Sequence, residues 1–87
     1  MNNLDELSKI INKLHSDKEI NNFLSELLTE SEINILSKRW RIMKMLQEGL
    51  TQREIAKNLS VSLCKVTRGA KILKDKNAIT TKILKEG

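Results

Sequence analysis

The amino-acid sequence predicts an all-α protein. Apolar residues recur at spacings of three and four along most of the chain, which places them on one face of a helix. A Ser or Thr followed three residues later by Glu, the capping box that begins many helices, occurs three times. The chain also has no proline and only 2% aromatic residues. We therefore expect six helices in a single domain that spans residues 1–87.

Two helices are predicted in the first third of the chain. The first is an amphipathic helix over residues 3–15, with apolar side chains at Leu4, Leu7, Ile10, Ile11 and Leu14. Ser16 and Glu19 then form a capping box. The second helix follows it, with apolar side chains at Ile20, Phe23, Leu24 and Leu27.

The third predicted helix runs from about residue 30 to Glu48 and stops at Gly49, a residue that suits the end of a helix. Thr29 and Glu32 form the capping box at its start. Its apolar residues fall on more than one side, with Ile33, Leu36, Trp40 and Met43 on one and Ile35, Ile42, Met45 and Leu46 on others. Such a helix must be covered on more than one side, so we expect the helices of residues 3–48 to form a dimer interface. A wide apolar face toward a single core is the alternative.

Residues 51–73, TQREIAKNLSVSLCKVTRGAKIL, predict two short helices joined by a tight turn. Thr51 and Glu54 cap the first helix, and Ser62 caps the second. Ser60 stands in the turn, where a left-handed backbone is common and a non-glycine residue costs about 1 kcal/mol. This pattern is typical of a DNA-binding helix-turn-helix, whose second helix enters the major groove. An ordinary helical hairpin is the alternative.

Inside this pair of helices, the small Ala56 allows a close approach, and Val61 and Val66 would fill the angle between them. A polar break follows, after which Asn77 can cap a last helix over residues 77–86. The residues expected to point inward from that helix are Ala78, Ile79, Ile83 and Leu84.

The net charge of +5 is unevenly distributed. Residues 1–37 hold three lysines and seven acidic residues, whereas residues 38–76 hold eleven Lys and Arg and three acidic residues. The basic part coincides with the expected helix-turn-helix and its flanks, as a surface that neutralises phosphates requires. The charge distribution therefore favours double-stranded DNA as the partner.

The sequence argues against several other classes of protein. It has no apolar run of about 18 residues, and its first residues lack the order of a signal peptide, so we expect a cytoplasmic protein without a membrane span. Cys64 has no disulfide partner, and one cysteine with one histidine, His15, makes no metal site. No nucleophile–base pair, carboxylate pair or phosphate loop is present, so we expect no catalytic residues.

Four short runs of the sequence resemble the bacterial Trp repressor family: LLTESE, KRWRI, LTQREIA and, after a turn, VTRG. The resemblance covers about residues 20–84 in the same helix order. It implies a six-helix, Trp-repressor-like fold in which two chains interlock through their N-terminal and third helices as an intertwined homodimer. It also implies a double-stranded DNA operator as the partner and L-tryptophan, or a related indole, as a co-repressor bound beside the DNA-reading helices.

The resemblance implies which residues would hold this ligand. Arg39 and Arg68 match two arginines that sandwich the indole ring, and Arg68 matches the one that also binds the carboxylate. A guanidinium can both stack on an aromatic ring and pair bidentately with a carboxylate. The other implied ligand residues are Thr29 near the carboxylate, Glu26 and Leu28 with backbone carbonyls at the amine, and Gly69 in the pocket wall. Ile72 also lines this pocket, but it departs from the family pattern, which has a small polar residue that helps to hold the amine.

The resemblance also implies a DNA surface. Gln52 and Arg53 match residues that contact phosphate and, for the arginine, a guanine edge. The second helix of the pair would approach bases with Leu63, Cys64 and Thr67, and would contact phosphates with Lys65 and Lys71. Lys65 departs from the family pattern, because a hydroxyl is usual at its position.

Three functions are compatible with these residues. The leading interpretation is a homodimeric transcriptional repressor with a small-molecule co-repressor. A second keeps the DNA binding without the ligand, with the pocket filled by Ile72. The third is a helical protein-interaction module, such as an antitoxin or an adaptor, whose basic face meets an acidic protein.

Overall fold

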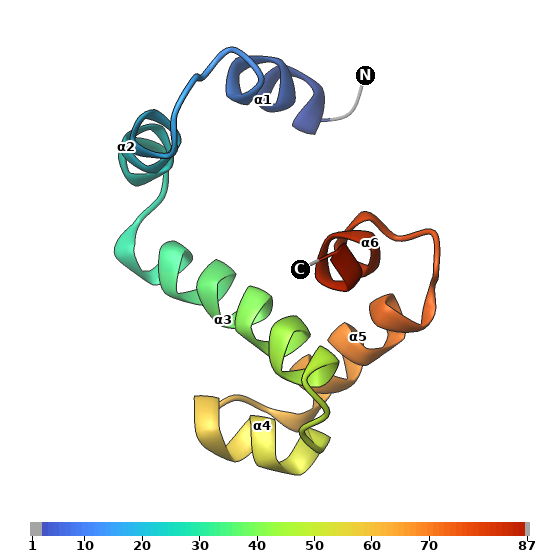
Figure 1. The fold of residues 1–87 in the computed structure, drawn as a ribbon. Helices are drawn as coiled ribbons and strands as arrows, with labels where there is room; N and C mark the ends of the chain where they lie inside the picture. Colours follow the sequence, from blue (N-terminus) through green and yellow to red (C-terminus); the bar gives the residue numbers. More distant parts are fainter. Residues whose placement is uncertain (1–2, 87) are drawn as a thin grey trace. The chain divides into compact units, whose positions relative to one another are not determined.

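The computed structural model describes residues 3–86, and this part of the chain forms six α-helices and no strand (Figure 1). The helices are α1 (Leu4–Ile11), α2 (Asp17–Leu27), α3 (Glu30–Gln47), α4 (Gln52–Leu59), α5 (Leu63–Lys74) and α6 (Ile79–Glu86). The prediction of an all-α protein with six helices is therefore confirmed. The chain divides into two compact units, one ending at Ile33 and the other beginning at Asn34.

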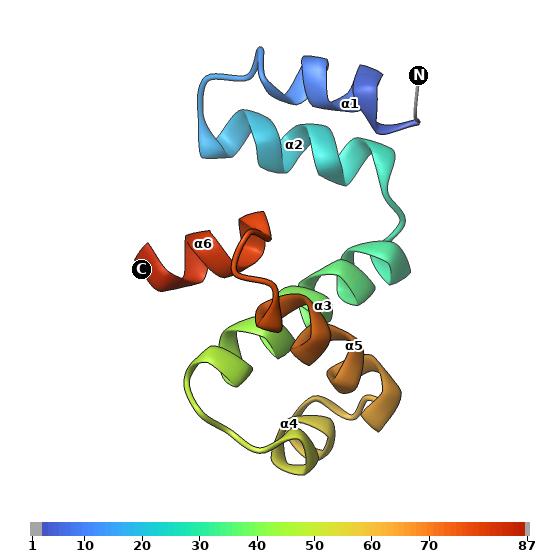
Figure 2. The same cartoon turned by 90° about the vertical axis from the view of Figure 1, so that its right-hand side faces the viewer.

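The N-terminal unit contains α1, α2 and the first turn of α3. Helices α1 and α2 run in opposite directions (Figure 2). Neither helix contains a buried residue. The large apolar side chains that remain exposed here are Leu4, Leu7, Ile11 and Leu27. Both helices are thus amphipathic, with apolar faces that are only partly covered within this unit.

Each of the three predicted capping boxes begins a helix. The boxes differ in the backbone N–H group that the Glu carboxylate accepts. In each box the hydroxyl oxygen accepts the backbone N–H of the Glu, at 3.1 Å for Ser16, 3.1 Å for Thr29 and 3.2 Å for Thr51. Before α3 the contact is reciprocal, because Thr29 N–H donates to Glu32 Oε1 at 2.9 Å. Before α2, Glu19 Oε1 instead accepts the N–H of His15 at 2.7 Å.

Helix α1 is shorter than predicted. Helix α1 ends at Ile11, earlier than the expected end at residue 15. His15 is held by the Glu19 carboxylate, and Ser16 has an extended backbone with φ −147° and ψ 159°. An α-helix cannot continue through such a residue, but α1 has already ended before it. Lys13 and Leu14 donate their N–H groups to the carbonyls of Ile10 and Ile11, three residues earlier, as in a 3₁₀ turn. Leu14 therefore lies outside the helix to which its spacing assigned it.

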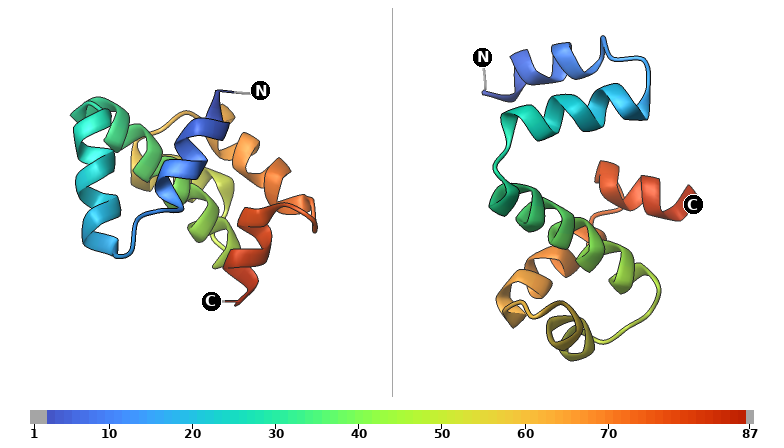
Figure 3. Two further views of the ribbon diagram at one scale, coloured as in Figure 1. Left: turned by 90° about the horizontal axis from the view of Figure 1, so that it is seen from above. Right: turned by 90° about the vertical axis from the view of Figure 1, so that its left-hand side faces the viewer.

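The second unit contains most of α3 together with α4, α5 and α6. Helices α4 and α5 lie against the C-terminal half of α3, and α6 follows on the side away from α4 (Figures 1 and 3). Its core consists of Ile42 from α3, Ile55 from α4 and Val66 from α5, which are 2%, 0% and 0% exposed. Partly buried apolar residues surround them: Met45, Leu46, Leu50, Ala56, Leu59 and Val61. The expected position of Val66 between the two short helices is confirmed.

Helices α3 and α4 end with the same hydrogen-bond pattern. Gly49 follows α3 with φ 96°, and Ser60 follows α4 with φ 53°. In both cases this residue and the next one donate their N–H groups to carbonyls three and five residues earlier. These two bonds define the Schellman motif, which ends a helix on a left-handed residue. The expected left-handed backbone at Ser60 is therefore confirmed.

The residues predicted to point inward from the last helix do so only in part, because only Ala78 and Leu84 are half-buried. Ile79 and Ile83, expected to point inward, are 74% and 50% exposed, whereas Thr81 is buried. The Thr81 hydroxyl donates to the backbone carbonyl of Ile72 at 3.2 Å, which directs this face of α6 toward α5. Apolar spacing groups Ile79 with Ile83, but the prediction that this group faces inward was wrong.

The turn before α6 is organised by Asp75. Its carboxylate Oδ1 accepts the N–H of Asn77 at 2.9 Å, and its carbonyl accepts the N–H of Ala78 at 3.2 Å. Helix α6 consequently begins at Ile79, later than the expected start at Asn77.

Part of the apolar surface of α3 is uncovered in the second unit. Ile42 and Met43 are buried, whereas Ile35, Leu36 and Trp40 are 42%, 48% and 43% exposed. The helix is therefore apolar on sides that α4, α5 and α6 do not cover.

Candidate functional site

Helices α4 and α5 form a two-helix unit, here called the helix-turn-helix unit (residues 51–74). Thr51 caps α4, and Ser62 Oγ caps α5 by accepting the N–H of Lys65 at 3.4 Å. The left-handed Ser60 reverses the chain between them. Because the fully buried Ile55 and Val66 come from the two helices of this unit, its angle is set by core packing as well as by the turn.

The outer surface of α5 carries most of the residues predicted to contact DNA. A surface hollow of about 310 Å³ is lined by Cys64, Thr67, Arg68 and Lys71. Arg68 and Lys71 give this hollow two positive charges. Arg53 on α4 and Leu63 at the start of α5 are also exposed. The helix-turn-helix unit thus presents a basic surface on the helix that the sequence assigned to the major groove.

Gln52 and Thr67, both predicted to contact DNA, contact each other. The Thr67 hydroxyl lies 2.9 Å from Gln52 Oε1 and 3.0 Å from the carbonyl of Leu63, so its single proton can be donated to either oxygen. The bond to Gln52 joins the first turn of α4 to the middle of α5. It leaves the Gln52 amide nitrogen, a donor, directed away from this bond and available to an acceptor.

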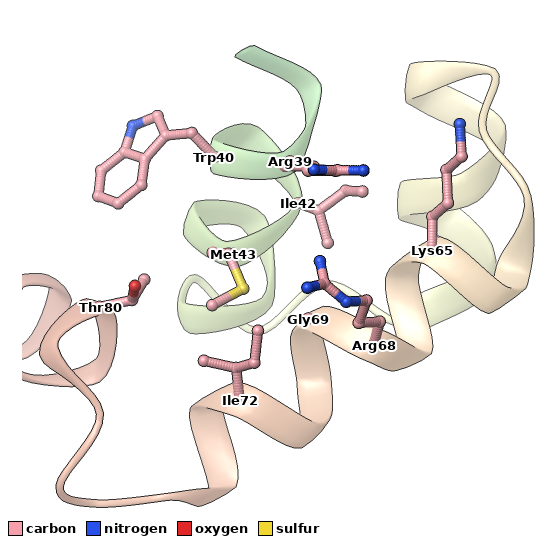
Figure 4. Close-up of a pocket in the computed structure, with 9 residues that line it drawn as sticks. All are labelled: Arg39, Trp40, Ile42, Met43, Lys65, Arg68, Gly69, Ile72 and Thr80. Atoms are coloured by element: carbon pink, nitrogen blue, oxygen red, sulfur yellow. The ribbon is translucent and has the colours of Figure 1, made fainter. Parts of the chain in front are cut away.

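A pocket of about 240 Å³ lies between α3 and α5, close to the start of α6 (Figure 4). It is lined by Arg39, Trp40, Ile42, Met43, Lys65, Arg68, Gly69, Ile72 and Thr80. Three of these side chains are cationic and none is acidic. We call this space the α3–α5 pocket.

Four of the seven predicted ligand residues line the α3–α5 pocket: Arg39, Arg68, Gly69 and Ile72. Lys65, predicted to contact phosphate, lines it as well. Four further residues line the pocket that were not among the predicted ligand residues: Trp40, Ile42, Met43 and Thr80. Met43 could have been found, because it lies four residues after Arg39 on the same helix and so shares its face. No local signal identifies Thr80, which reaches the pocket through the turn between α5 and α6.

The remaining predicted ligand residues belong to the N-terminal unit. Glu26 is exposed in the last turn of α2. Leu28 follows that helix and donates its N–H to the carbonyl of Leu24 at 2.9 Å. The Thr29 hydroxyl oxygen accepts the N–H of Glu32, which leaves the hydroxyl proton available to another acceptor.

Gly69 allows α5 to approach α3 closely. A Cβ at this position would lie 3.0 Å from Ile42 Cγ2, 3.0 Å from Met43 Sδ and 3.5 Å from Leu46 Cδ1. The first two distances are shorter than ordinary van der Waals contact. A larger residue would therefore require the Ile42 and Met43 side chains, which line the α3–α5 pocket, to shift.

A second cavity, of about 480 Å³, lies between α3 and α6. It is lined by Trp40, Lys44, Gln47, Glu48, Ile83 and Leu84. The Trp40 side chain borders both this cavity and the α3–α5 pocket. The exposed Ile83 of α6 thus lines a cavity between α6 and α3.

Three further properties concern residues 3–86. No helix in this range is long and apolar enough to cross a membrane. No group of three or more His, Cys, Asp or Glu side chains in it could hold a metal ion. Cys64 is a free, exposed thiol.

Comparison with known proteins gives a consistent family assignment. The family model described as Trp repressor protein matches residues 2–87. A Trp operon repressor homolog of Xylella fastidiosa (strain M23) is 42% identical over 72 residues, which are 82% of this chain and 78% of the relative. A Trp operon repressor homolog of Chlamydia trachomatis (serovar D) is 38% identical over 66 residues, 75% of this chain and 70% of the relative.

A third relative is more distant. The Trp operon repressor homolog of Chlamydia caviae is 32% identical over 74 residues, 84% of this chain and 73% of the relative. No solved structure gives a significant match. The family model covers nearly the whole chain, and the relatives carry the same name at identities above 30%. The chain therefore belongs to the Trp repressor family.

Proposed function

We propose that this protein is a homodimeric, sequence-specific DNA-binding repressor controlled by L-tryptophan or a related indole. The observation that carries the proposal is the position of Arg68. Its side chain lines the α3–α5 pocket and also the hollow on the outer surface of α5. A ligand that binds Arg68 in the pocket would therefore act directly on the helix that meets DNA.

The DNA-binding part of the proposal is supported by charge and exposure. Arg53, Arg68 and Lys71 are exposed on the helix-turn-helix unit, where they can neutralise phosphates or reach a base edge. We assign Arg53 to a base edge and Lys71 to a phosphate. Gln52 would contact phosphate through its amide nitrogen while its oxygen is held by Thr67.

The ligand part is supported by the composition of the α3–α5 pocket. Arg39 and Arg68 provide two guanidinium groups for a carboxylate and an aromatic ring. Their charges have no acidic side chain beside them in the pocket, so an anion would be bound favourably. Glu26, Leu28 and Thr29 are the further ligand residues that the family pattern implies.

The dimer is supported by apolar surface that one chain leaves exposed. Ile35, Leu36 and Trp40 of α3 are exposed, and no residue of α1 or α2 is buried. A chain of 87 residues with so few buried side chains gains stability by covering such surfaces in an oligomer. We propose that residues 3–48 form the interface of an intertwined homodimer.

A regulator that binds DNA without a ligand is the second candidate. It is favoured by Ile72, whose branched apolar side chain occupies part of the wall where the family has a small polar residue. In that case the pocket would be a packing defect between α3 and α5, and DNA affinity would not respond to indoles.

Fluorescence anisotropy on a labelled duplex pool of random sequence, followed by selection from that pool with and without L-tryptophan, tests both candidates. We expect salt-dependent binding to the random pool and recovery of one sequence motif whose affinity rises with the ligand. A recovered motif with ligand-independent affinity would support the second candidate. Absence of any salt-dependent DNA binding would contradict both and favour a protein-interaction module.

A further inference from the structure

We propose that Thr81 is a positioning residue for DNA binding, whose hydroxyl holds the C-terminal half of α5 through the carbonyl of Ile72. This inference rests on the proposed function, because it names a residue that acts on the DNA surface of α5 without touching DNA. Its starting point is the burial of Thr81. This side chain is 2% exposed, and it is the one buried polar side chain in the part of the chain that the structure describes.

Helix α5 contacts α4 and α6, which hold different parts of it. In Figure 1, α4 lies below α5 and α6 lies above it. The N-terminal half of α5 packs on α4 through the buried Val66, and its Thr67 hydroxyl lies 2.9 Å from Gln52 Oε1 of α4. The C-terminal half meets α6, where the Thr81 hydroxyl donates to the carbonyl of Ile72 at 3.2 Å. Two threonine hydroxyls therefore hold the two halves of one helix.

The end of α5 needs a partner from outside the helix. The last four carbonyls of an α-helix have no acceptor role inside it, and the carbonyl of Ile72 is one of them because α5 ends at Lys74. This carbonyl accepts the N–H of Asp75 at 3.1 Å from the adjacent turn and the hydroxyl of Thr81 from α6. Of these two bonds, the second joins the end of α5 to another helix. Its loss would let the last turn of α5 open more readily.

The end of α5 also carries part of the DNA surface. Lys71 directly precedes Ile72, is exposed, and lines the basic hollow with Arg68. A phosphate contact by Lys71 requires this part of α5 to stay helical, because a frayed turn must be ordered again when DNA binds. Arg53 lies on α4, so its contact does not depend on the end of α5. We therefore expect Thr81 to act through Lys71 and not through Arg53.

Thr81→Val removes the hydroxyl but keeps the size and the β-branching of the side chain. Anisotropy titrations of the full chain on the random duplex pool measure the effect, at salt concentrations where circular dichroism shows the variant fully folded. We expect the affinity to fall about two- to tenfold. The salt slope should fall by part of the unit, about one, that Lys71 contributes. Thr81→Ser keeps the hydroxyl and should restore both quantities.

Double mutants separate positioning from a general loss of stability. Thr81→Val and Lys71→Ala should be non-additive, because the first already removes part of the contact that the second deletes. Thr81→Val and Arg53→Ala should be additive. Arg53→Ala is the matched control, since it removes an exposed cation of the helix-turn-helix unit from α4. An unchanged salt slope with additive effects in both pairs would show a purely structural role and overturn the inference.

Amide hydrogen exchange tests the contact without DNA. In Thr81→Val the amides of residues 73–75 should exchange faster, whereas those of Val66 and Thr67 should keep their rates. If Thr81→Val does not fold, Thr81→Ser decides, because both its exchange and its salt slope must equal those of the unaltered protein. A Thr81→Ser variant that departs from them would overturn the inference.

The outcomes also distinguish this inference from the proposed function. Absence of DNA binding by the unaltered protein would overturn the proposed function and the inference together. Unchanged exchange at residues 73–75 of Thr81→Val, in a protein that binds DNA, would overturn the inference alone.

Discussion

At the scale of single residues, the ends of α3 and α4 allow glycine and serine to be compared in the same left-handed backbone position. Both helices end in a Schellman motif, one with Gly49 and one with Ser60 in the left-handed position. In an L-residue the Cβ approaches the carbonyl oxygen in this conformation, at a cost of about 1–2 kcal/mol. The chain therefore contains the same turn twice, once with glycine, which adopts the left-handed conformation without strain, and once with serine, which does not.

We expect Ser60→Gly to stabilise the fold by about 0.5–1 kcal/mol, because the relief of backbone strain exceeds the added entropy of glycine in the unfolded chain. Gly49→Ser should destabilise it by about 1–2 kcal/mol. A Cβ at Gly49 meets no atom within 4 Å, so this loss would come from the backbone alone. Urea unfolding at one protein concentration measures the change in the free energy of unfolding for both variants. An unchanged free energy in Gly49→Ser would contradict the proposed backbone strain.

Arg53 and Lys71 are predicted to contribute to DNA binding in different ways. Arg53→Ala should weaken binding to the selected motif by about 1–3 kcal/mol, because a bidentate contact to a base edge is lost. Lys71→Ala should weaken binding to all sequences alike and reduce the salt slope by about one unit. Anisotropy titrations over a range of salt concentrations measure both quantities. Equal changes in slope, without loss of specificity, would make Arg53 a phosphate contact.

At the scale of helices, the hydrogen bond between Thr67 and Gln52 fixes α5 relative to α4. Each of these residues was predicted to contact DNA from its own position in the helix-turn-helix pattern. The structure adds a second role, because the Thr67 hydroxyl holds the Gln52 oxygen and thereby orients its amide nitrogen. In the proposed function, Thr67 would then be a positioning residue that acts on DNA partly through Gln52.

Thr67→Val should reduce both stability and DNA affinity, by about 0.5–1.5 kcal/mol in stability, because one neutral hydrogen bond is lost. Thr67→Ser keeps the hydroxyl and should restore the DNA affinity. A double-mutant cycle with Gln52→Leu isolates the pair, since residues in direct contact give non-additive effects. A coupling energy near zero would show that the two side chains act independently.

The helices and their caps could be predicted because their signals are local. The boxes at Ser16, Thr29 and Thr51 lie within four consecutive residues each, and the buried Val66 follows from spacing along α5. The pocket could be predicted only in part. Arg39 and Arg68 came from the family resemblance, whereas Thr80 enters through the packing of α6 on α5.

The orientation of α6 could not be predicted from the sequence, because it also depends on a contact with another helix. Its apolar residues define one face, but the buried face is chosen by a hydrogen bond from Thr81 to a carbonyl of another helix. Such a bond depends on where α5 ends and on the turn formed by Asp75. Neither is encoded in the apolar spacing of α6.

At the scale of the whole molecule, we expect an obligate dimer. The apolar surface of α3 formed by Ile35, Leu36 and Trp40 is exposed in one chain, and obligate homodimers cover such surfaces. Sedimentation equilibrium should therefore detect no folded monomer at micromolar concentration. The temperature of unfolding should rise with protein concentration, because association stabilises only the folded state.

A pair of matched substitutions tests which exposed apolar surface forms the dimer interface. Leu36 and Leu63 are similarly exposed, at 48% and 46%, but only Leu36 lies on α3. Leu36→Asp should dissociate or unfold the dimer, because it would bury a carboxylate without a partner. Leu63→Asp should leave the mass unchanged. A dimer that tolerates Leu36→Asp would place the interface elsewhere.

The position of Trp40 has a spectroscopic consequence. It is the only tryptophan in a chain without tyrosine, so the near-ultraviolet emission of the protein comes from one indole. That indole is 43% exposed and borders both the α3–α5 pocket and the cavity between α3 and α6. A protomer covering α3 would exclude water from the ring and shift its emission toward shorter wavelengths. A non-fluorescent aromatic acid in the pocket would change the intensity instead, so subunit association and ligand binding can be followed separately, without a label, from the same side chain.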